Sequence, residues 1–121
     1  MKENIGTVQY ASLLFDFYGE MLRDSQAEVM TLYHEDNLSL AEIAQELGTS
    51  RQAVHYTLKK AEASLEKYEE KLGLLKNYLR NQEKAEAAIA GCRRLIDSGR
   101  LNEEDIEELR TVIDTVREIS E

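Results

Sequence analysis

The sequence contains no proline, no tryptophan and only one cysteine in 121 residues. Because proline removes a backbone donor and breaks helices, its absence, together with only six glycines, predicts an all-α fold. A single cysteine excludes an intrachain disulfide and a metal site with several cysteine ligands. No apolar run approaches the roughly 20 residues that span a bilayer, and no basic segment followed by an apolar one stands at the N-terminus. We therefore expect a cytoplasmic protein that does not insert into membranes.

Residues with obvious catalytic use are also scarce. His34 and His55 are the only histidines, and no metal-ligand spacing, glycine-rich phosphate loop or nucleophile beside a base accompanies them. We expect no enzyme activity, no metal and no cofactor. Charge is abundant instead, with 24 acidic and 15 basic residues and a formal net charge of −9. With hydrophobic residues at 42% and charged residues at 32%, the composition is typical of a soluble globular protein.

One segment in the middle of the sequence has the spacing of a helix-turn-helix. Ser39 and Glu42 form an S-x-x-E capping box, which predicts a helix that begins directly after the serine. Gly48 suits the left-handed conformation that ends a helix, and Thr49 or Ser50 can cap a second helix. In such a motif the N-terminal residues of the second helix enter the major groove of DNA.

The second helix of this motif carries side chains that suit DNA. Arginine pairs with guanine, glutamine pairs with adenine, and lysine binds phosphates. The candidate DNA-contacting residues are Thr49, Ser50, Arg51, Gln52, His55, Tyr56, Lys59 and Lys60. From Thr49 to Lys60 there are three basic residues and no acidic one, although residues 71–82 share this composition. An ordinary helical hairpin with a solvated polar face is the alternative interpretation.

Helices are also predicted before the motif. Apolar positions repeat with helical spacing over residues 7–22, which predicts one helix there. A second S-x-x-E pattern, Ser25 with Glu28, predicts a helix that opens at that box. The motif would therefore contribute the third and fourth helices of an N-terminal domain.

The helices after the turn extend beyond a minimal DNA-binding domain. Apolar residues follow alternating steps of four and three, a heptad seam. The seam consists of Val54, Leu58, Ala61, Leu65, Tyr68, Leu72, Leu75 and Leu79. It predicts one helix over residues 51–80, and a weaker helical pattern continues to Ile96, with a bend near Gly73 or Asn81 as an open alternative. Asn102 with Asp105 predicts the start of a last helix. We divide the chain into a helix-turn-helix domain, residues 1–72, and a helical extension, residues 73–121. The seam is either bundle core or an oligomer interface, and we favour a homodimer formed through the extension.

Several segments in the first two thirds of the chain together indicate one protein family more specifically than the helix-turn-helix motif does. They are residues 14–18 (Leu-Phe-Asp-Phe-Tyr), 32–33, 36–44, 50–54 and 67–72 (Lys-Tyr-Glu-Glu-Lys-Leu). Together they closely resemble the YlxM family of small bacterial proteins, and their core is similar to region 4 of bacterial sigma factors. The resemblance implies a regulatory protein that binds double-stranded DNA and is linked to the signal recognition particle pathway. Its recognition residues would be Ser50, Arg51, Gln52, His55, Tyr56 and Lys59.

Two functions remain open from the sequence. The first is a DNA-binding regulator of helix-turn-helix type. The second is a module that docks a protein or ribonucleoprotein of the signal recognition particle pathway without reading a DNA sequence. DNA binding needs Arg51, Lys59 and Lys60 exposed on one face, whereas docking needs an exposed apolar stripe in the extension.

Overall fold

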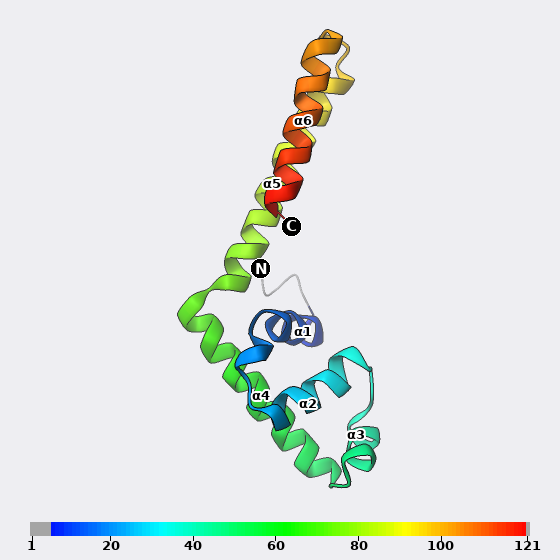
Figure 1. Cartoon of the computed structure of the whole chain (residues 1–121), viewed down its shortest axis with the longest axis vertical. Coiled ribbons are helices and arrows are strands. Elements are labelled where there is room, and N and C mark those ends of the chain that lie inside the picture. Colours follow the sequence, from blue (N-terminus) through cyan, green and yellow to red (C-terminus); the bar gives the residue numbers. More distant parts are fainter. Residues whose placement is uncertain (1–5, 121) are drawn as a thin grey trace. The chain divides into compact units, whose positions relative to one another are not determined.

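A computed structural model describes residues 6–120, and its regular structure there is entirely helical (Figure 1). The α-helices are α1 (Thr7–Tyr18), α2 (Asp24–Met30), α3 (Leu40–Leu47), α4 (Arg51–Leu72), α5 (Leu74–Asp97) and α6 (Glu103–Ser120). A 3-10 turn, Gly19–Met21 (η2), follows α1, and a π-helical turn, Thr31–Glu35 (η3), continues α2. The predicted all-α fold class is confirmed.

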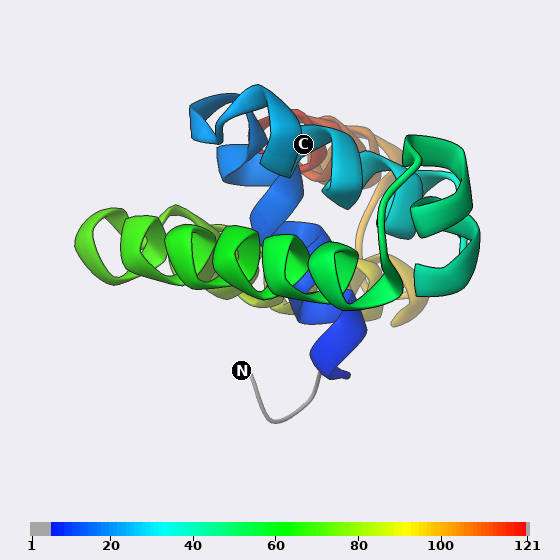
Figure 2. The same ribbon diagram turned by 90° about the horizontal axis from the view of Figure 1, so that it is seen from below.

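The chain forms two compact units, one up to Leu75 and one from Lys76 onward. Helix α4 is the central helix of the first unit, because α1, α2 and α3 all pack against it. Figure 2 shows α3 beside the N-terminal end of α4. The domain division at residues 72 and 73 stays a prediction.

The core of the first unit takes up the first half of the heptad seam. On α4 it buries Val54, Leu58, Ala61 and Leu65, each at most 4% exposed. The other buried hydrophobic residues of this unit are Ala11, Leu14, Tyr18, Leu22, Val29, Met30, Ile43, Ala44 and Leu75. These four seam residues are therefore core within a single chain. Burial of the seam is interrupted at Leu72, which is 52% exposed, and returns at Leu75, which is fully buried in the same unit.

The prediction of one continuous helix over residues 51–80 is wrong. Helix α4 ends at Leu72, because Gly73 adopts the left-handed conformation with φ 61° and ψ 26°. Any residue with a Cβ would be strained there, so glycine is what permits the break. Helix α5 starts immediately afterwards, at Leu74.

A buried tyrosine holds the joint between α4 and α5. The Tyr18 hydroxyl donates to Glu69 Oε1 at 2.5 Å and accepts from the backbone N–H of Leu74 at 3.0 Å. The same Glu69 oxygen accepts from the backbone N–H of Leu75 at 3.1 Å. The first N–H groups of a helix have no acceptor within the helix, so these two side chains supply one from outside. Burial raises the pKa of Tyr18, and its hydrogen bond to Glu69 raises it further.

The second predicted capping box does not form. Helix α2 begins at Asp24, and its N-cap residue, Arg23, makes no side-chain cap. The backbone N–H of Ala27 already donates to the carbonyl of Arg23 at 2.9 Å. Ser25 is therefore inside the first turn rather than at the capping position, because the helix starts earlier than the pattern indicates.

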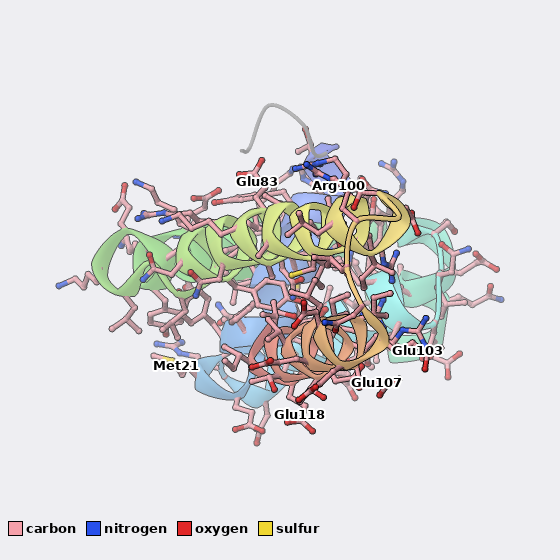
Figure 3. The ribbon with its side chains drawn as sticks, turned by 90° about the horizontal axis from the view of Figure 1, so that it is seen from above. Met21, Glu83, Arg100, Glu103, Glu107 and Glu118 are labelled. Atoms are coloured by element: carbon pink, nitrogen blue, oxygen red, sulfur yellow. The ribbon has the colours of Figure 1, made fainter. Side chains whose placement is uncertain are left out.

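In the second unit, α6 begins where the sequence predicts. The Asn102 Oδ1 atom accepts from the backbone N–H of Asp105 at 2.8 Å and caps the helix. Ile113 is buried. Glu103, Glu107 and Glu118 project from the side of α6 that faces away from α5 (Figure 3). Because the apolar residues of α6 recur at steps of three and four, they share one side of the helix, and these carboxylates lie on the other.

Candidate nucleic-acid interface

The turn between α3 and α4 is built as the sequence predicts. The backbone N–H of Glu42 donates to Ser39 Oγ at 3.1 Å, and Glu42 Oε1 accepts from the backbone N–H of Ser39 at 2.9 Å. Gly48 is left-handed, with φ 67° and ψ 38°. Ser50 Oγ accepts from the backbone N–H of Ala53 at 3.0 Å and caps α4. The predicted helix-turn-helix is confirmed.

The capping box has an electrostatic consequence for its carboxylate. The hydrogen bond from the backbone N–H of Ser39, together with its hydroxyl, lowers the pKa of Glu42. This group therefore stays ionised near neutral pH at the positive end of the α3 dipole. The charge strengthens the start of α3 and leaves the rim of the motif acidic on that side.

Every residue that the sequence proposes for DNA contact is exposed in the structure. These residues are Thr49, Ser50, Arg51, Gln52, His55, Tyr56, Lys59 and Lys60. The hydroxyl of Ser50 is engaged in the helix cap, and Tyr56 is 64% exposed. Their role in DNA contact stays a prediction.

These residues do not share one face of α4. Successive helical residues are rotated by about 100°, so Arg51 and Lys60 point in roughly opposite directions around the axis. Arg51, His55 and Lys59 line a pocket on the side of α1. Tyr56 and Lys60 line a groove on the side of α2. Gln52 is exposed between these two flanks, and at this helical spacing its side chain projects away from the buried seam.

The α1-side pocket has a mixed lining and a volume of about 470 Å³. Apolar residues of α1 and α4, including Leu14 and Leu58, line it together with two carboxylates, Glu62 and Glu66. Lys59 Nζ lies 3.3 Å from Glu62 Oε1 in an i,i+3 ion pair. The positive charge of Lys59 is therefore partly offset on this flank.

The groove on the other flank has a volume of about 520 Å³ and lies between α2 and α4. We call it the α2–α4 groove. Arg23 and Lys60 contribute its cations, and no carboxylate is among its lining residues. Lys60 Nζ lies 5.6 Å from the centre of the Tyr56 ring, within the range of a cation–π contact. Arg23 is not among the contact residues that the sequence predicts, because only the packing of α2 on α4 brings it near Lys60.

His34 lies outside this surface. Its ring meets the ring of Tyr33 edge-on, with centroids 4.9 Å apart. Its Nε2 atom is buried without a hydrogen-bond partner. Burial lowers the pKa of His34, and the carboxylates of Glu62 and Asp16 oppose that shift. Among residues 6–120, no group of three or more histidine, cysteine or acidic side chains is placed to hold a metal ion.

Comparison with known proteins supports the helix-turn-helix. A family model described as "UPF0122: Putative helix-turn-helix protein, YlxM / p13 like" matches residues 6–91. A UPF0122 protein of Thermoanaerobacter sp. (strain X514) is 42% identical over 112 residues, which cover 93% of this chain and 92% of the relative.

No helix in the described part of the chain is long and apolar enough to cross a membrane.

Two further relatives cover different shares of the chain. A UPF0122 protein of Acetivibrio thermocellus is 38% identical over 114 residues, 94% of this chain and 97% of its own length. A UPF0122 protein of Listeria welshimeri is 54% identical over 67 residues, 55% of this chain and 61% of its own length. The chain therefore belongs to the UPF0122 family of YlxM / p13-like helix-turn-helix proteins.

Proposed function

We propose that this chain is a non-enzymatic regulatory protein that binds double-stranded DNA through α3 and α4. The observation that carries the proposal is the exposed, acid-free start of α4 behind a fully capped turn. In helix-turn-helix proteins this part of the second helix enters the major groove, while the first helix crosses the backbone. A bacterial DNA-binding role implies a cytoplasmic protein.

Side chains at different positions on α4 would make different contacts with DNA. Gln52 has the geometry to pair with the N6 and N7 atoms of adenine, and Arg51 with the O6 and N7 atoms of guanine. Lys59 lies on the α1 flank of α4 and Lys60 on the α2 flank, where they would meet phosphates. Long-range repulsion between the −9 chain and DNA is screened over about 8 Å at physiological salt. We therefore expect weak binding to random sequences and a marked preference for particular sites.

A homodimer would place two such helices on one DNA molecule. Because the first half of the seam is core within one chain, the contact between copies would use the second unit. Its exposed apolar side chains include Leu95, Val112 and Ile119, which are 42%, 42% and 81% exposed. Sedimentation at micromolar concentration should then give roughly twice the 13.9 kDa chain mass. A monomer at high concentration would contradict the dimer without affecting DNA binding by one copy.

Selection from random duplexes tests the proposal directly. The full chain should enrich a sequence motif, and Gln52→Ala should weaken binding to it by about 5-fold to 150-fold, the equivalent of roughly 1–3 kcal/mol. Gln9→Ala is the matched control, because Gln9 is exposed on α1 and lines neither the pocket nor the groove. If no motif is enriched and no duplex is retarded at low salt, the proposed function is wrong.

The second candidate is a docking module for the signal recognition particle pathway. The exposed apolar residues of the second unit favour it, since docking requires such a surface. Recovery of the particle's protein or RNA on the immobilised chain would support it, provided that Ile119→Glu abolishes the recovery. A triple replacement of Arg51, Gln52 and Lys59 by alanine should leave that recovery intact if docking and DNA reading use separate surfaces.

A further inference from the structure

The α2–α4 groove is lined by cations although the chain has a formal net charge of −9. Arg23 and Lys60 line it, and neither forms an ion pair with a carboxylate in the described part of the chain. Lys59, one residue before Lys60, is by contrast paired with Glu62. Unpaired cations in a groove free of carboxylates create a local positive potential, which favours an anionic ligand.

The groove also carries neutral hydrogen-bond donors. Ser25, Gln26, Thr57 and Ser64 line it with three hydroxyl groups and one amide. Arginine, lysine, serine, threonine and glutamine are the side chains that most often contact the phosphates of DNA. The α1-side pocket lacks this combination, because Glu62, Glu66 and an apolar lining occupy it.

Each aromatic ring of the groove makes a contact within the chain. The ammonium group of Lys60 lies over the Tyr56 ring at 5.6 Å. Tyr68 packs against Tyr18, with ring centroids 6.1 Å apart, and its hydroxyl donates to the carbonyl of Met21 at 3.3 Å. A protein that binds single strands normally offers open ring faces for base stacking. The groove therefore suits a sugar-phosphate backbone better than unpaired bases.

The groove adjoins the start of α4, which we propose contacts the bases of DNA. Tyr56 and Lys60 lie on α4 within three turns of its start, and Tyr56 lies beside Gln52 around the helix. We propose that the α2–α4 groove binds the phosphodiester backbone of duplex DNA next to the bases that α4 reads, with Arg23 as a phosphate ligand. This inference rests on the proposed function and adds a contact from α2, outside the helix-turn-helix.

The salt dependence of binding tests the groove separately from base reading. Each phosphate contact contributes about 0.9 to the slope of log affinity against log salt on duplex DNA. Arg23→Gln should therefore lower the slope by about 0.9, and the loss of affinity between 50 and 200 mM salt should become about 3.5-fold smaller than in the unchanged chain. Arg23→Gln with Lys60→Gln should make that loss about 12-fold smaller.

Lys84→Gln is the control for net charge, because Lys84 is exposed on α5 and lines no part of the groove. The probe is the duplex that the full chain selects, and circular dichroism checks that each variant is folded. If the chain binds this duplex and Arg23→Gln behaves like Lys84→Gln, the groove proposal is overturned while the proposed function stands. If the unchanged chain binds no duplex, both are overturned.

A uridine 20-mer, measured in parallel, separates duplex from single strand. We expect Arg23→Gln to weaken binding to the duplex. A loss confined to the 20-mer would show that the groove takes single-stranded RNA and would overturn the duplex assignment.

Discussion

Removal of one oxygen atom from the joint between α4 and α5 should destabilise the first unit. Tyr18 is 1% exposed, and its hydroxyl connects Glu69 at the end of α4 with Leu74 at the start of α5. Tyr18→Phe keeps the ring and its packing but removes both hydrogen bonds. The carboxylate of Glu69 retains the N–H of Leu75 as a donor.

The size of the effect follows from the two lost bonds. A hydrogen bond to a charged group contributes about 1.5–3 kcal/mol to stability. The N–H of Leu74 should add little, because this residue is 47% exposed and water can replace the hydroxyl. We expect a loss of about 2 kcal/mol in the free energy of unfolding.

Urea denaturation followed by tyrosine fluorescence measures this loss. Tyr56→Phe is the matched control, because the same atom is removed from a ring that is 64% exposed, and its effect should stay within about 0.5 kcal/mol. Glu69→Gln combined with Tyr18→Phe should cost less than the two single changes added together, since the residues share one bond. Equal midpoints for Tyr18→Phe and Tyr56→Phe would refute the role of this joint.

The same tyrosine gives stability a dependence on alkaline pH. Burial and the bond to Glu69 raise the pKa of Tyr18 above its ordinary value of 10.0. The unfolded chain therefore releases this proton first, and its contribution to stability is present below about pH 10 and lost above it. Tyr18→Phe should remove this part of the alkaline loss, and an unchanged profile above pH 10 would contradict the assignment.

Three further predictions use the same denaturation assay. Burial lowers the pKa of His34 below 6.5, so the free energy of unfolding should fall as the pH drops below about 6.5. His34→Gln should remove this loss of stability, whereas the control His55→Gln, at an exposed position, should retain it. Gly73→Ala should lower the free energy of unfolding by about 1–2 kcal/mol because φ is 61° at this position. Gly91→Ala, inside α5, should raise it by about 0.5–1 kcal/mol, and a change in the same direction for both variants would contradict the backbone argument. Ser39→Ala should cost about 1 kcal/mol by opening the capping box, and an unchanged midpoint would show that α3 does not depend on it.

Local features of the helix-turn-helix can be predicted from neighbouring residues. The start of α3, the left-handed turn at Gly48 and the cap at Ser50 are each decided by residues within four positions of one another. Hydrogen bonds of this range join neighbouring residues, so residue type and spacing predict these three features, although the same spacing at Ser25 and Glu28 forms no capping box. The all-α class followed equally directly, because no proline interrupts the helical periodicity.

Features that join distant segments depend on how the helices pack against one another. The heptad pattern runs through Gly73 without interruption, but the hydroxyl of Tyr18, far away in the sequence, provides the acceptor that lets a new helix begin at Leu74. Periodicity records which positions are apolar, not whether the helix that carries them is continuous. In the same way, the pattern of α4 could not assign Arg51 and Lys60 to different flanks, since α1 and α2 define those flanks. Arg23 joins Lys60 only because α2 packs against α4.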